Sequence, residues 1–186
     1  MMKATKSFCS TPQSMLKMDL KLDEVLFTKS INTPLGSLKI TTNKTQLVSI
    51  AFNNNDNHLH TGLELPIIMT TVEHQLGAYF NKSLIQFNIP MAPKGTEFQH
   101  LVWERLQQIE YGKTISYQQL AEQMGNRSKT RAVASATAKN PILIVIPCHR
   151  VIGTDGRLTG YSGGIDNKRE LLIHEGFLNH KNSILF

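Results

Sequence analysis

Short runs of alternating apolar and polar residues fill the first third of the chain, and turn-forming residues separate them. The alternation predicts strands over residues 25–31, 37–42 and 46–52, because successive side chains on a strand point to opposite faces. Thr33-Pro34-Leu35-Gly36 has proline at the second position of a turn, which indicates a hairpin between the first two strands. Asn43-Lys44 separates the second strand from the third. The pattern therefore predicts a small antiparallel meander.

A helical pattern follows a polar loop over residues 53–60. Four apolar residues recur at the spacing of one helix face: Val72, Leu76, Tyr79 and Phe80. Thr70 and Glu73 form a capping-box pair, so we expect the helix to begin at Thr70 and to end within residues 81–83. Residues 84–89 are predicted as one more strand. Residues 90–94 contain two prolines and are interpreted as a linker.

Two further capping-box pairs open the second half of the chain. Thr96 with Gln99 predicts a helix whose apolar stripe comprises Phe98, Val102, Leu106 and Ile109. Ser116 with Gln119 predicts a short helix that ends near residue 124. The second half is therefore expected to be mainly helical.

Ser128 is expected to cap the next helix, which continues to about residue 140 and is stopped by Pro141. Together with the preceding short helix and the turn at Gly125, this is a helix-turn-helix pattern. Asp166 or Asn167 is expected to cap a last helix, which stops at Gly176.

These elements predict an α+β protein with two domains. We expect a leader over residues 1–20 and a supporting domain over 21–92, in which a helix packs on an antiparallel sheet. Residues 93–186 should form a mainly helical, winged-helix-like domain with the helix-turn-helix. A chain of 186 residues is long enough to bury such a core.

Charge and composition narrow the range of possible binding partners and of cell compartments. The net charge is +6, which favours polyanions such as nucleic acid or an anionic membrane surface. No apolar stretch approaches the roughly 20 residues of a membrane span, and the leader lacks a secretory apolar core. The two cysteines, Cys9 and Cys148, do not make a disulfide framework, so a reducing cytoplasm and a free thiol are expected.

The predicted second helix of the helix-turn-helix carries almost only small side chains over residues 131–138. One interpretation is a tightly packed buried helix, and the other is a helix whose backbone approaches a DNA groove. A basic cluster of Arg127, Lys129 and Arg131 lies at its start, where these cations oppose the helix dipole and would suit an external anion. A solvated basic face is the alternative.

The strongest chemical signal surrounds Cys148. It follows five aliphatic residues, 142–146, and Pro147, so a thiol is held where a buried segment meets a turn. Inert packing is the alternative for such a cysteine. A nucleophilic thiol needs a base or cation to lower its pKa, and His149 is the candidate base. Glu175, near the end of the last helix, is the carboxylate that we expect to orient His149.

A set of motifs in the second half resembles a known family. Its core is Pro147-Cys148-His149-Arg150-Val151, flanked by Gly95-Thr96, Phe98-Gln99, Val102-Trp103, Tyr111-Gly112, Ser116-Tyr117, Leu120-Ala121, Arg131-Ala132-Val133, Asn140-Pro141, Gly160-Tyr161-Ser162-Gly163-Gly164, Lys168, Leu171-Leu172 and Glu175-Gly176. In order and spacing, this run resembles the methylated-DNA–protein-cysteine methyltransferases, also called O6-alkylguanine-DNA alkyltransferases. The first half matches only in length and in its order of strands and helix.

The resemblance implies a direct DNA repair reaction without a cofactor. Cys148 would accept the alkyl group of O6-alkylguanine irreversibly, with O4-alkylthymine as a second candidate substrate, and His149, through water, and Glu175 would activate it. Tyr117 would press on the target phosphate, help to rotate the nucleotide out and donate to the leaving guanine. The substrate pocket would comprise Tyr117, Asn140, Val151, Tyr161, Ser162 and Lys168, with Asn140 as an interdomain hinge.

The same resemblance implies double-stranded DNA as the partner of a monomeric protein. Arg131 would fill the gap that the flipped base leaves, and the small-residue helix would lie in the minor groove. The DNA-binding set that we predict is Thr96, Gln118, Arg127, Lys129, Arg131, Ala132 and Ser135. Cys9, His58, His60 and His74 form a weak ligand set, so no metal is predicted.

Two other functions compete with alkyl transfer. The first is a damage sensor or helix-turn-helix regulator, which would keep its function after Cys148→Ser. The second is a cysteine hydrolase that uses Cys148, His149 and Glu175 on an acyl substrate, for which the sequence reveals no oxyanion hole.

Overall fold

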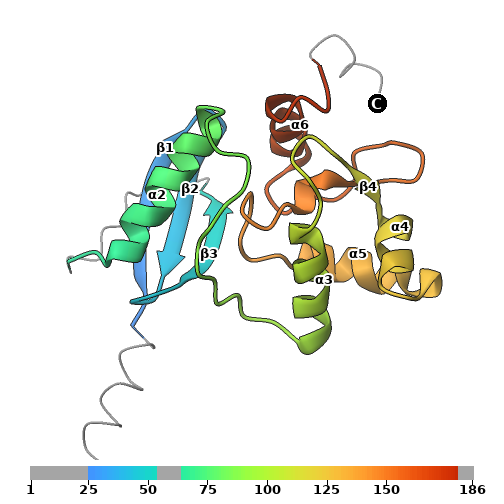
Figure 1. The fold of residues 1–186 in the computed structure, drawn as a ribbon, viewed down its shortest axis with the longest axis horizontal. Coiled ribbons are helices and arrows are strands. Elements are labelled where there is room, and N and C mark those ends of the chain that lie inside the picture. The colour runs from blue at the N-terminus through green and yellow to red at the C-terminus, as the bar shows by residue number, and fades with distance from the viewer. Residues whose placement is uncertain (1–24, 54–63, 180–186) are drawn as a thin grey trace, which may run out of the picture.

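The computed structural model describes residues 25–53 and 64–179, which form two lobes joined by residues 81–96 (Figure 1). The N-terminal lobe contains β1 (Phe27–Thr33), β2 (Gly36–Thr42), β3 (Leu47–Phe52) and α2 (Ile67–Phe80). The strands form one antiparallel sheet in the order β1-β2-β3, and α2 lies along one face of it. The predicted meander and hairpin turn are confirmed.

The apolar pattern explains how this lobe holds together. Leu38 and Ile40 alternate on β2 and are fully buried, as are Leu47 and Ile50 on β3. Most of the apolar stripe of α2 is buried as well, which gives the sheet a helical cover. Burial of alternate residues is what fixes the strand register.

Two expectations for this half of the chain are wrong. Helix α2 begins at Ile67, after Pro66, rather than at Thr70, and no side chain caps it. Residues 84–89 form no strand, because the side chain of Gln75 bonds both backbone groups of Asn88 at 2.8 Å in place of a strand partner. The predicted leader lies outside the described residues.

The C-terminal lobe is mainly helical, as expected, and confirms the α+β class. Its elements are α3 (Glu97–Gln107), β4 (Ile115–Ser116), α4 (Tyr117–Gln123), the 3-10 helix η1 (Arg127–Lys129), α5 (Thr130–Ala138), the 3-10 helix η2 (Cys148–Arg150), β5 (Val151–Ile152) and α6 (Ile165–His174). Strands β4 and β5 pair in parallel. Both predicted capping boxes, at the starts of α3 and α4, are present.

Two predicted helix starts in this lobe are wrong. Ser128 does not cap α5; the side chain of Asn126 accepts from the Ser128 backbone instead, and η1 precedes α5. Helix α6 begins at Ile165, directly after Gly164, rather than after Asp166 or Asn167. The left-handed backbone of Gly164, with φ 89°, turns the chain into the helix without a side-chain cap.

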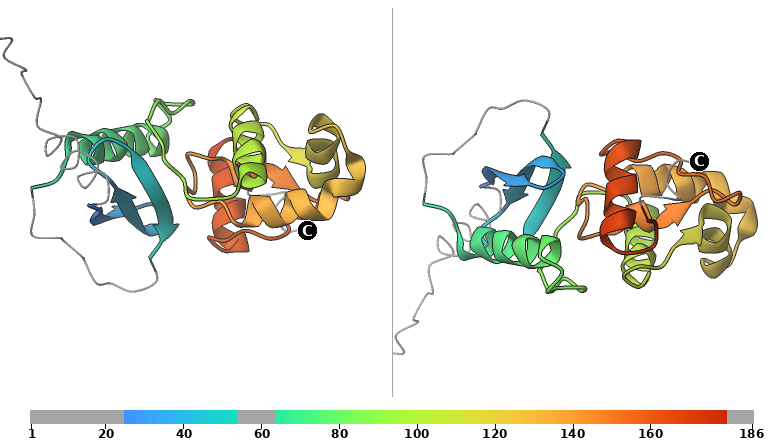
Figure 2. Two further views of the ribbon diagram at one scale, coloured as in Figure 1. Left: turned by 90° about the horizontal axis from the view of Figure 1, so that it is seen from below. Right: turned by 90° about the horizontal axis from the view of Figure 1, so that it is seen from above.

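The edge strand β3 joins the two lobes. Its Leu47 backbone pairs with Pro90 and Ala92, both at 2.8 Å. Farther along β3, the amide of Ile50 donates to Pro141 at 2.9 Å, and its carbonyl accepts from Leu143 at 3.1 Å. The lobes lie side by side in both views of Figure 2. The sheet edge therefore fixes the segment that leads to Cys148.

Among the described helices, none combines the length and apolar content that crossing a membrane would require.

Candidate active site

The segment before Cys148 is buried but forms tight turns rather than a strand. Residues 142–146 are all buried, as predicted. Ile144 adopts φ 73°, a conformation that costs a β-branched residue roughly 1–3 kcal/mol. The amide of Cys148 donates to the carbonyl of Ile146 at 2.8 Å, which folds the chain sharply into η2. Tertiary packing therefore holds a strained backbone directly before the thiol.

Cys148 is only 3% exposed, and Asn140 holds its sulfur. The Asn140 amide group lies 3.0 Å from Sγ and donates to the Ile146 carbonyl at 2.8 Å. Burial raises the pKa of Cys148 to about 11, although the Asn140 hydrogen bond and the positive charge of Lys168 oppose the shift. The sequence led us to expect that neighbours lower this pKa, but burial outweighs them. The free protein therefore holds a protonated thiol at neutral pH.

His149 and Glu175 form the predicted pair. Nε2 of His149 lies 2.8 Å from Oε1 of Glu175, and both side chains are fully buried. Burial lowers the pKa of His149, against the opposing pull of Glu175, so the imidazole is neutral. A carboxylate only accepts, which assigns the proton of the neutral ring to Nε2 and leaves Nδ1 as an acceptor. Nδ1 is buried and has no hydrogen-bond partner among the described residues.

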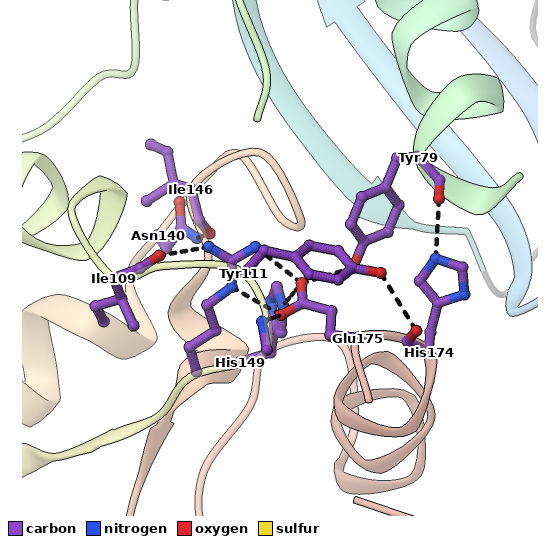
Figure 3. Close-up of polar contacts among 10 residues, drawn as sticks. Tyr79, Ile109, Tyr111, Asn140, Ile146, His149, His174 and Glu175 are labelled. Carbon is purple, nitrogen blue, oxygen red and sulfur yellow. Dashed lines mark hydrogen bonds and ion pairs between the residues drawn. The ribbon is translucent and has the colours of Figure 1, made fainter. Parts of the chain in front are cut away.

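Glu175 is the centre of a larger network that Figure 3 shows. Arg150 donates to both carboxylate oxygens at 2.9 Å, and Tyr79 donates to Oε1 at 2.8 Å. The amide of Gly112 donates to Oε2 at 3.2 Å, and a Cβ at this glycine would lie 2.9 Å from the Glu175 carbonyl oxygen. Burial alone would raise the pKa of Glu175, but the donors from His149 and Arg150 together lower it far below its usual range. Glu175 is therefore a carboxylate at every ordinary pH.

Sequence reasoning missed two members of this network. In the sequence, Arg150 is only one residue of the motif around Cys148, yet its guanidinium also donates to the carbonyl of Ile109. Tyr79 falls on the apolar face of a helix, and its spacing carries no sign of a polar role. Adjacency to His149 is the signal that could have singled out Arg150, whereas no sequence signal identifies Tyr79.

Several predicted pocket residues lie together beside this network. Lys168 is fully buried and donates to Val151 at 2.6 Å and to Thr159 at 2.8 Å. Its Nζ lies 5.9 Å above the ring of Tyr117, whose hydroxyl also donates to Thr159, at 3.2 Å. Burial lowers the pKa of Lys168 to about 8, while the neighbouring Cys148 opposes the shift. The Lys168 cation therefore lies close to the Tyr117 ring and to the Cys148 thiol.

Tyr161 and Ser162 belong to the loop before α6. The Tyr161 ring meets His149 edge-on at 6.4 Å between centroids, and its buried hydroxyl has no partner within the described residues. Ser162 is exposed. A Cβ at Gly163 would lie 2.6 Å from the rings of both Tyr161 and Phe52, so the loop passes closely between them. Phe52 is on β3, so the N-terminal lobe supports this loop.

The predicted DNA-binding residues lie mostly on the surface. Those of η1 and α5 are all exposed: Arg127, Lys129, Arg131, Ala132 and Ser135. The opposite side of α5 is buried, where the carbonyl of Ala136 accepts from Trp103 at 2.9 Å. The buried side agrees with the interpretation of a tightly packed helix, and approach of the exposed side to a DNA groove stays a prediction.

Two other predicted DNA contacts already have local partners. Thr96 caps α3 through the amide of Gln99, and the side chain of Gln118 donates to Glu122 at 3.2 Å. Arg127 lies 3.5 Å from Glu122 as well. Arg131 and Lys129 form no ion pair within residues 25–53 and 64–179.

The described residues contain no group of three histidine, cysteine or acidic side chains that could hold a metal ion. Of the weak ligand set considered above, Cys9, His58 and His60 lie outside the described residues. A buried thiol that directly precedes a histidine paired with a carboxylate is the set of groups that a cysteine nucleophile requires.

Comparisons with known proteins place this site in a family. The DNA-binding domain of 6-O-methylguanine DNA methyltransferase matches residues 97–177, and the ribonuclease-like domain of the same protein family matches residues 26–93. A methylated-DNA–protein-cysteine methyltransferase from Mycolicibacterium paratuberculosis is 42% identical over 149 residues, 79% of this chain and 90% of the relative. One from Methanosarcina barkeri is 39% identical, over 76% of this chain and 92% of the relative.

Solved structures agree. The O6-methylguanine methyltransferase of Mycobacterium tuberculosis superposes with a TM-score of 0.71 at 37% identity, covering 81% of this chain and 93% of that one. The same protein in complex with DNA gives a TM-score of 0.72 at 37% identity, covering 82% and 95%. The chain belongs to the methylated-DNA–protein-cysteine methyltransferase family.

Proposed function

We propose that this protein repairs double-stranded DNA by moving the alkyl group of O6-alkylguanine irreversibly onto Cys148, with O4-alkylthymine as a second candidate substrate. It would act as a monomer in the cytoplasm and need no cofactor. One observation carries the proposal: the buried Cys148 thiol is held by Asn140 directly before a neutral His149 whose Nε2 is fixed by Glu175. The family to which the chain belongs supports the same chemistry.

The network assigns a role to each group in the transfer. Because the pKa of Cys148 is raised, its proton must leave as the reaction proceeds, and Nδ1 of His149 is the acceptor, directly or through a water. Sulfur forms a bond to the alkyl carbon while the bond from that carbon to O6 breaks. The guanine that leaves takes up one proton at its ring, so the thiol proton is balanced. The thioether product is stable, and each molecule reacts once.

Residues beside the thiol would receive the extruded base. The Tyr117 hydroxyl, whose pKa burial raises, is a neutral donor suited to the leaving guanine. Tyr161 and Ser162 would line the base pocket. Lys168 would place positive charge beside the thiolate as it forms. These roles require the target nucleotide to leave the duplex, at a cost of a few kcal/mol.

The pair α4 and α5 is the proposed helix-turn-helix. The exposed Ala132 and Ser135 would let the backbone approach the groove, and Arg131 would occupy the space left by the extruded base. Lys129 and Arg127 would face phosphates, whose neutralisation gives binding a steep salt dependence. Free exposure of Arg131, with no ion pair in the described part of the chain, supports this assignment.

A cysteine hydrolase is disfavoured by one contact. Such an enzyme needs backbone donors aimed at the oxyanion, and the amide of the nucleophile is a common choice. Here the amide of Cys148 already donates to Ile146 at 2.8 Å.

Mass spectrometry after mixing with a duplex that carries O6-methylguanine tests the proposal. The tryptic peptide over residues 140–150 contains Cys148 and should gain one methyl group, stoichiometrically and without turnover. Cys148→Ser is the matched control, which should bind the duplex without gaining methyl. If the wild-type protein binds the duplex while its peptide stays unmodified, the protein is a sensor and alkyl transfer is rejected.

A further inference from the structure

One residue of the N-terminal lobe contacts the carboxylate that orients His149. The Tyr79 hydroxyl donates to Oε1 of Glu175 at 2.8 Å, and His149 bonds the same oxygen at the same distance. Figure 3 shows Tyr79 extending from α2 to Glu175, across the boundary between the lobes. The family resemblance implies no site residue in this lobe.

Tyr79 is held rigidly enough to position its partner. Its side chain is fully buried, and its ring packs against His174, Phe87 and Tyr111 with centroids 4.9, 5.4 and 6.1 Å away. Its backbone carbonyl also accepts from Nε2 of His174 at 2.9 Å. Because His174 directly precedes Glu175, Tyr79 holds the end of α6 at two points.

A packing role alone would not require the hydroxyl. Phenylalanine would fill the same space, and a buried hydroxyl is costly unless it is hydrogen-bonded. Glu175 already receives donors from Arg150, Gly112 and His149. Burial, followed by the negative charge of Glu175, raises the pKa of Tyr79, so this residue is always a neutral donor. The hydroxyl therefore adds a fixed dipole to the oxygen that His149 uses.

We propose that Tyr79 is a positioning residue, through which the N-terminal lobe sets the orientation of Glu175 and the proton affinity of His149. The inference rests on the proposed function. Sharing Oε1 with Tyr79 weakens the attraction between Glu175 and a positively charged imidazole. Without the hydroxyl, Glu175 stabilises the imidazolium more strongly, and the pKa of His149 rises. A protonated His149 accepts no proton, so the acid limb of the pH–rate profile moves to higher pH.

Other titratable groups also face this pair. They are Tyr79 from α2, Tyr111 from the turn after α3, Cys148 and Arg150 from η2, Tyr161 from the loop before α6, and Lys168 and His174 from α6. Tyr79→Phe keeps the ring that packs on His174 and the carbonyl that His174 contacts, so a shifted acid limb reports on the lost hydroxyl.

The test compares Tyr79→Phe with Tyr111→Phe. Both remove one phenolic hydroxyl at the lobe boundary, but that of Tyr111 donates to the backbone of His174, at 3.3 Å, and not to the Glu175 carboxylate. The methyl transfer rate at saturating O6-methylguanine duplex is measured from acid to neutral pH, together with duplex affinity and thermal unfolding.

For Tyr79→Phe we expect the methyl transfer rate to be about three- to tenfold lower, because one hydrogen bond is lost. The duplex affinity should be unchanged, and the acid limb of the pH–rate profile should lie at higher pH. Tyr111→Phe should keep the wild-type rate and limb. An acid limb that does not move in Tyr79→Phe overturns the proposal, whatever the rate or the melting temperature.

The failure of this inference can be told apart from that of the proposed function. If the wild-type protein transfers no methyl group, the proposed function fails. NMR titration of the His149 imidazole in wild type and Tyr79→Phe then decides the inference by itself. A higher pKa of His149 in the variant supports it, and an equal pKa overturns it.

Discussion

The two lobes bury different kinds of residue. Among the described residues of the N-terminal lobe, the buried polar ones are neutral: Thr41, Thr42 and Asn43. The described part of the C-terminal lobe buries four ionisable groups around one thiol: His149, Arg150, Lys168 and Glu175. Buried charges are costly unless each is paired, and apolar residues of equal size would often stabilise a fold better. The contrast teaches that the C-terminal lobe accepts a stability cost for its chemistry, while the N-terminal lobe is built for packing.

The lobes nevertheless meet at the site itself. Strand β3 fixes the segment before Cys148, Phe52 packs against the loop at Gly163, and Tyr79 reaches Glu175. The N-terminal lobe therefore contributes contacts to the candidate site as well as supporting it.

Loss of the Glu175 carboxylate should show the difference between the two lobes most strongly. Glu175→Ala leaves Arg150 buried without its partner, so we expect the free energy of unfolding in urea to fall by about 3–5 kcal/mol. Methyl transfer should be lost too. The exposed Glu170 on the neighbouring helix α6 is the control, and Glu170→Ala should change stability by less than about 0.5 kcal/mol. If Glu170→Ala lowered the free energy of unfolding as much as Glu175→Ala does, the stabilising role of the network around Glu175 would be contradicted.

A core substitution in the sheet should lower stability without touching the chemistry. Ile40 is fully buried on β2, and Ile40→Ala should reduce the free energy of unfolding by about 3 kcal/mol through the cavity it leaves. The folded fraction should still transfer methyl at the wild-type rate. Lys39→Ala, next to it on the opposite face of the strand, is the control and should have a small effect. A lower rate for the folded fraction would show that the sheet interior is coupled to the site.

A methyl group added at Gly163, in the loop before α6, should destabilise the fold. Gly163→Ala would place Cβ 2.6 Å from the rings of Phe52 and Tyr161, and we expect a loss of about 1–3 kcal/mol by thermal unfolding. Phe52→Leu should offset part of it in the double variant, because the two sites touch. Gly77 has open space around it, so Gly77→Ala on α2 should be neutral or stabilising. A strictly additive double variant would contradict the close packing.

Thr96 separates a capping role from the predicted DNA contact. Thr96→Ala removes the cap of α3 and should lower the free energy of unfolding by about 1 kcal/mol. Thr96→Ser keeps a hydroxyl that can cap the helix, so it should retain the wild-type stability. Duplex affinity, measured by fluorescence anisotropy, decides the second role. A fall in affinity beyond that of Thr96→Ser would support the DNA contact, and an unchanged affinity would leave only the cap.

The stability of the fold should depend least on pH near neutrality. The pKa of Glu175 is lowered from 4.5 by its donors, net of burial, so its contribution to stability is complete above pH 4.5 and is lost as pH falls toward the folded value. Burial lowers the pKa of His149 from 6.5, so its protonation below that pH destabilises the fold in the same direction. Unfolding measured between pH 7 and pH 3 should therefore show stability falling with acid. Glu175→Gln should flatten the lower part of that curve.

Much of the fold followed from local signals. Alternation located the strands, because burial of one face imposes a period of two, and capping boxes located α3 and α4, because their hydrogen bonds join residues three apart. The starts of α2, α5 and α6 were misplaced. Pro66, Asn126 and Gly164 shape these starts, and each competes with a nearby residue that looks equally suitable in sequence.

The sequence by itself determined the family and predicted the groups of the candidate site: the motif around Cys148, the adjacent His149, and a carboxylate at Glu175 whose contact with His149 is confirmed. Tertiary structure alone decided how these groups are tuned. It raised the pKa of Cys148, added Arg150 to Glu175, and brought Tyr79 from 96 residues away in the chain. Burial and long-range contacts depend on how the lobes pack together, and residue spacing carries no record of that packing.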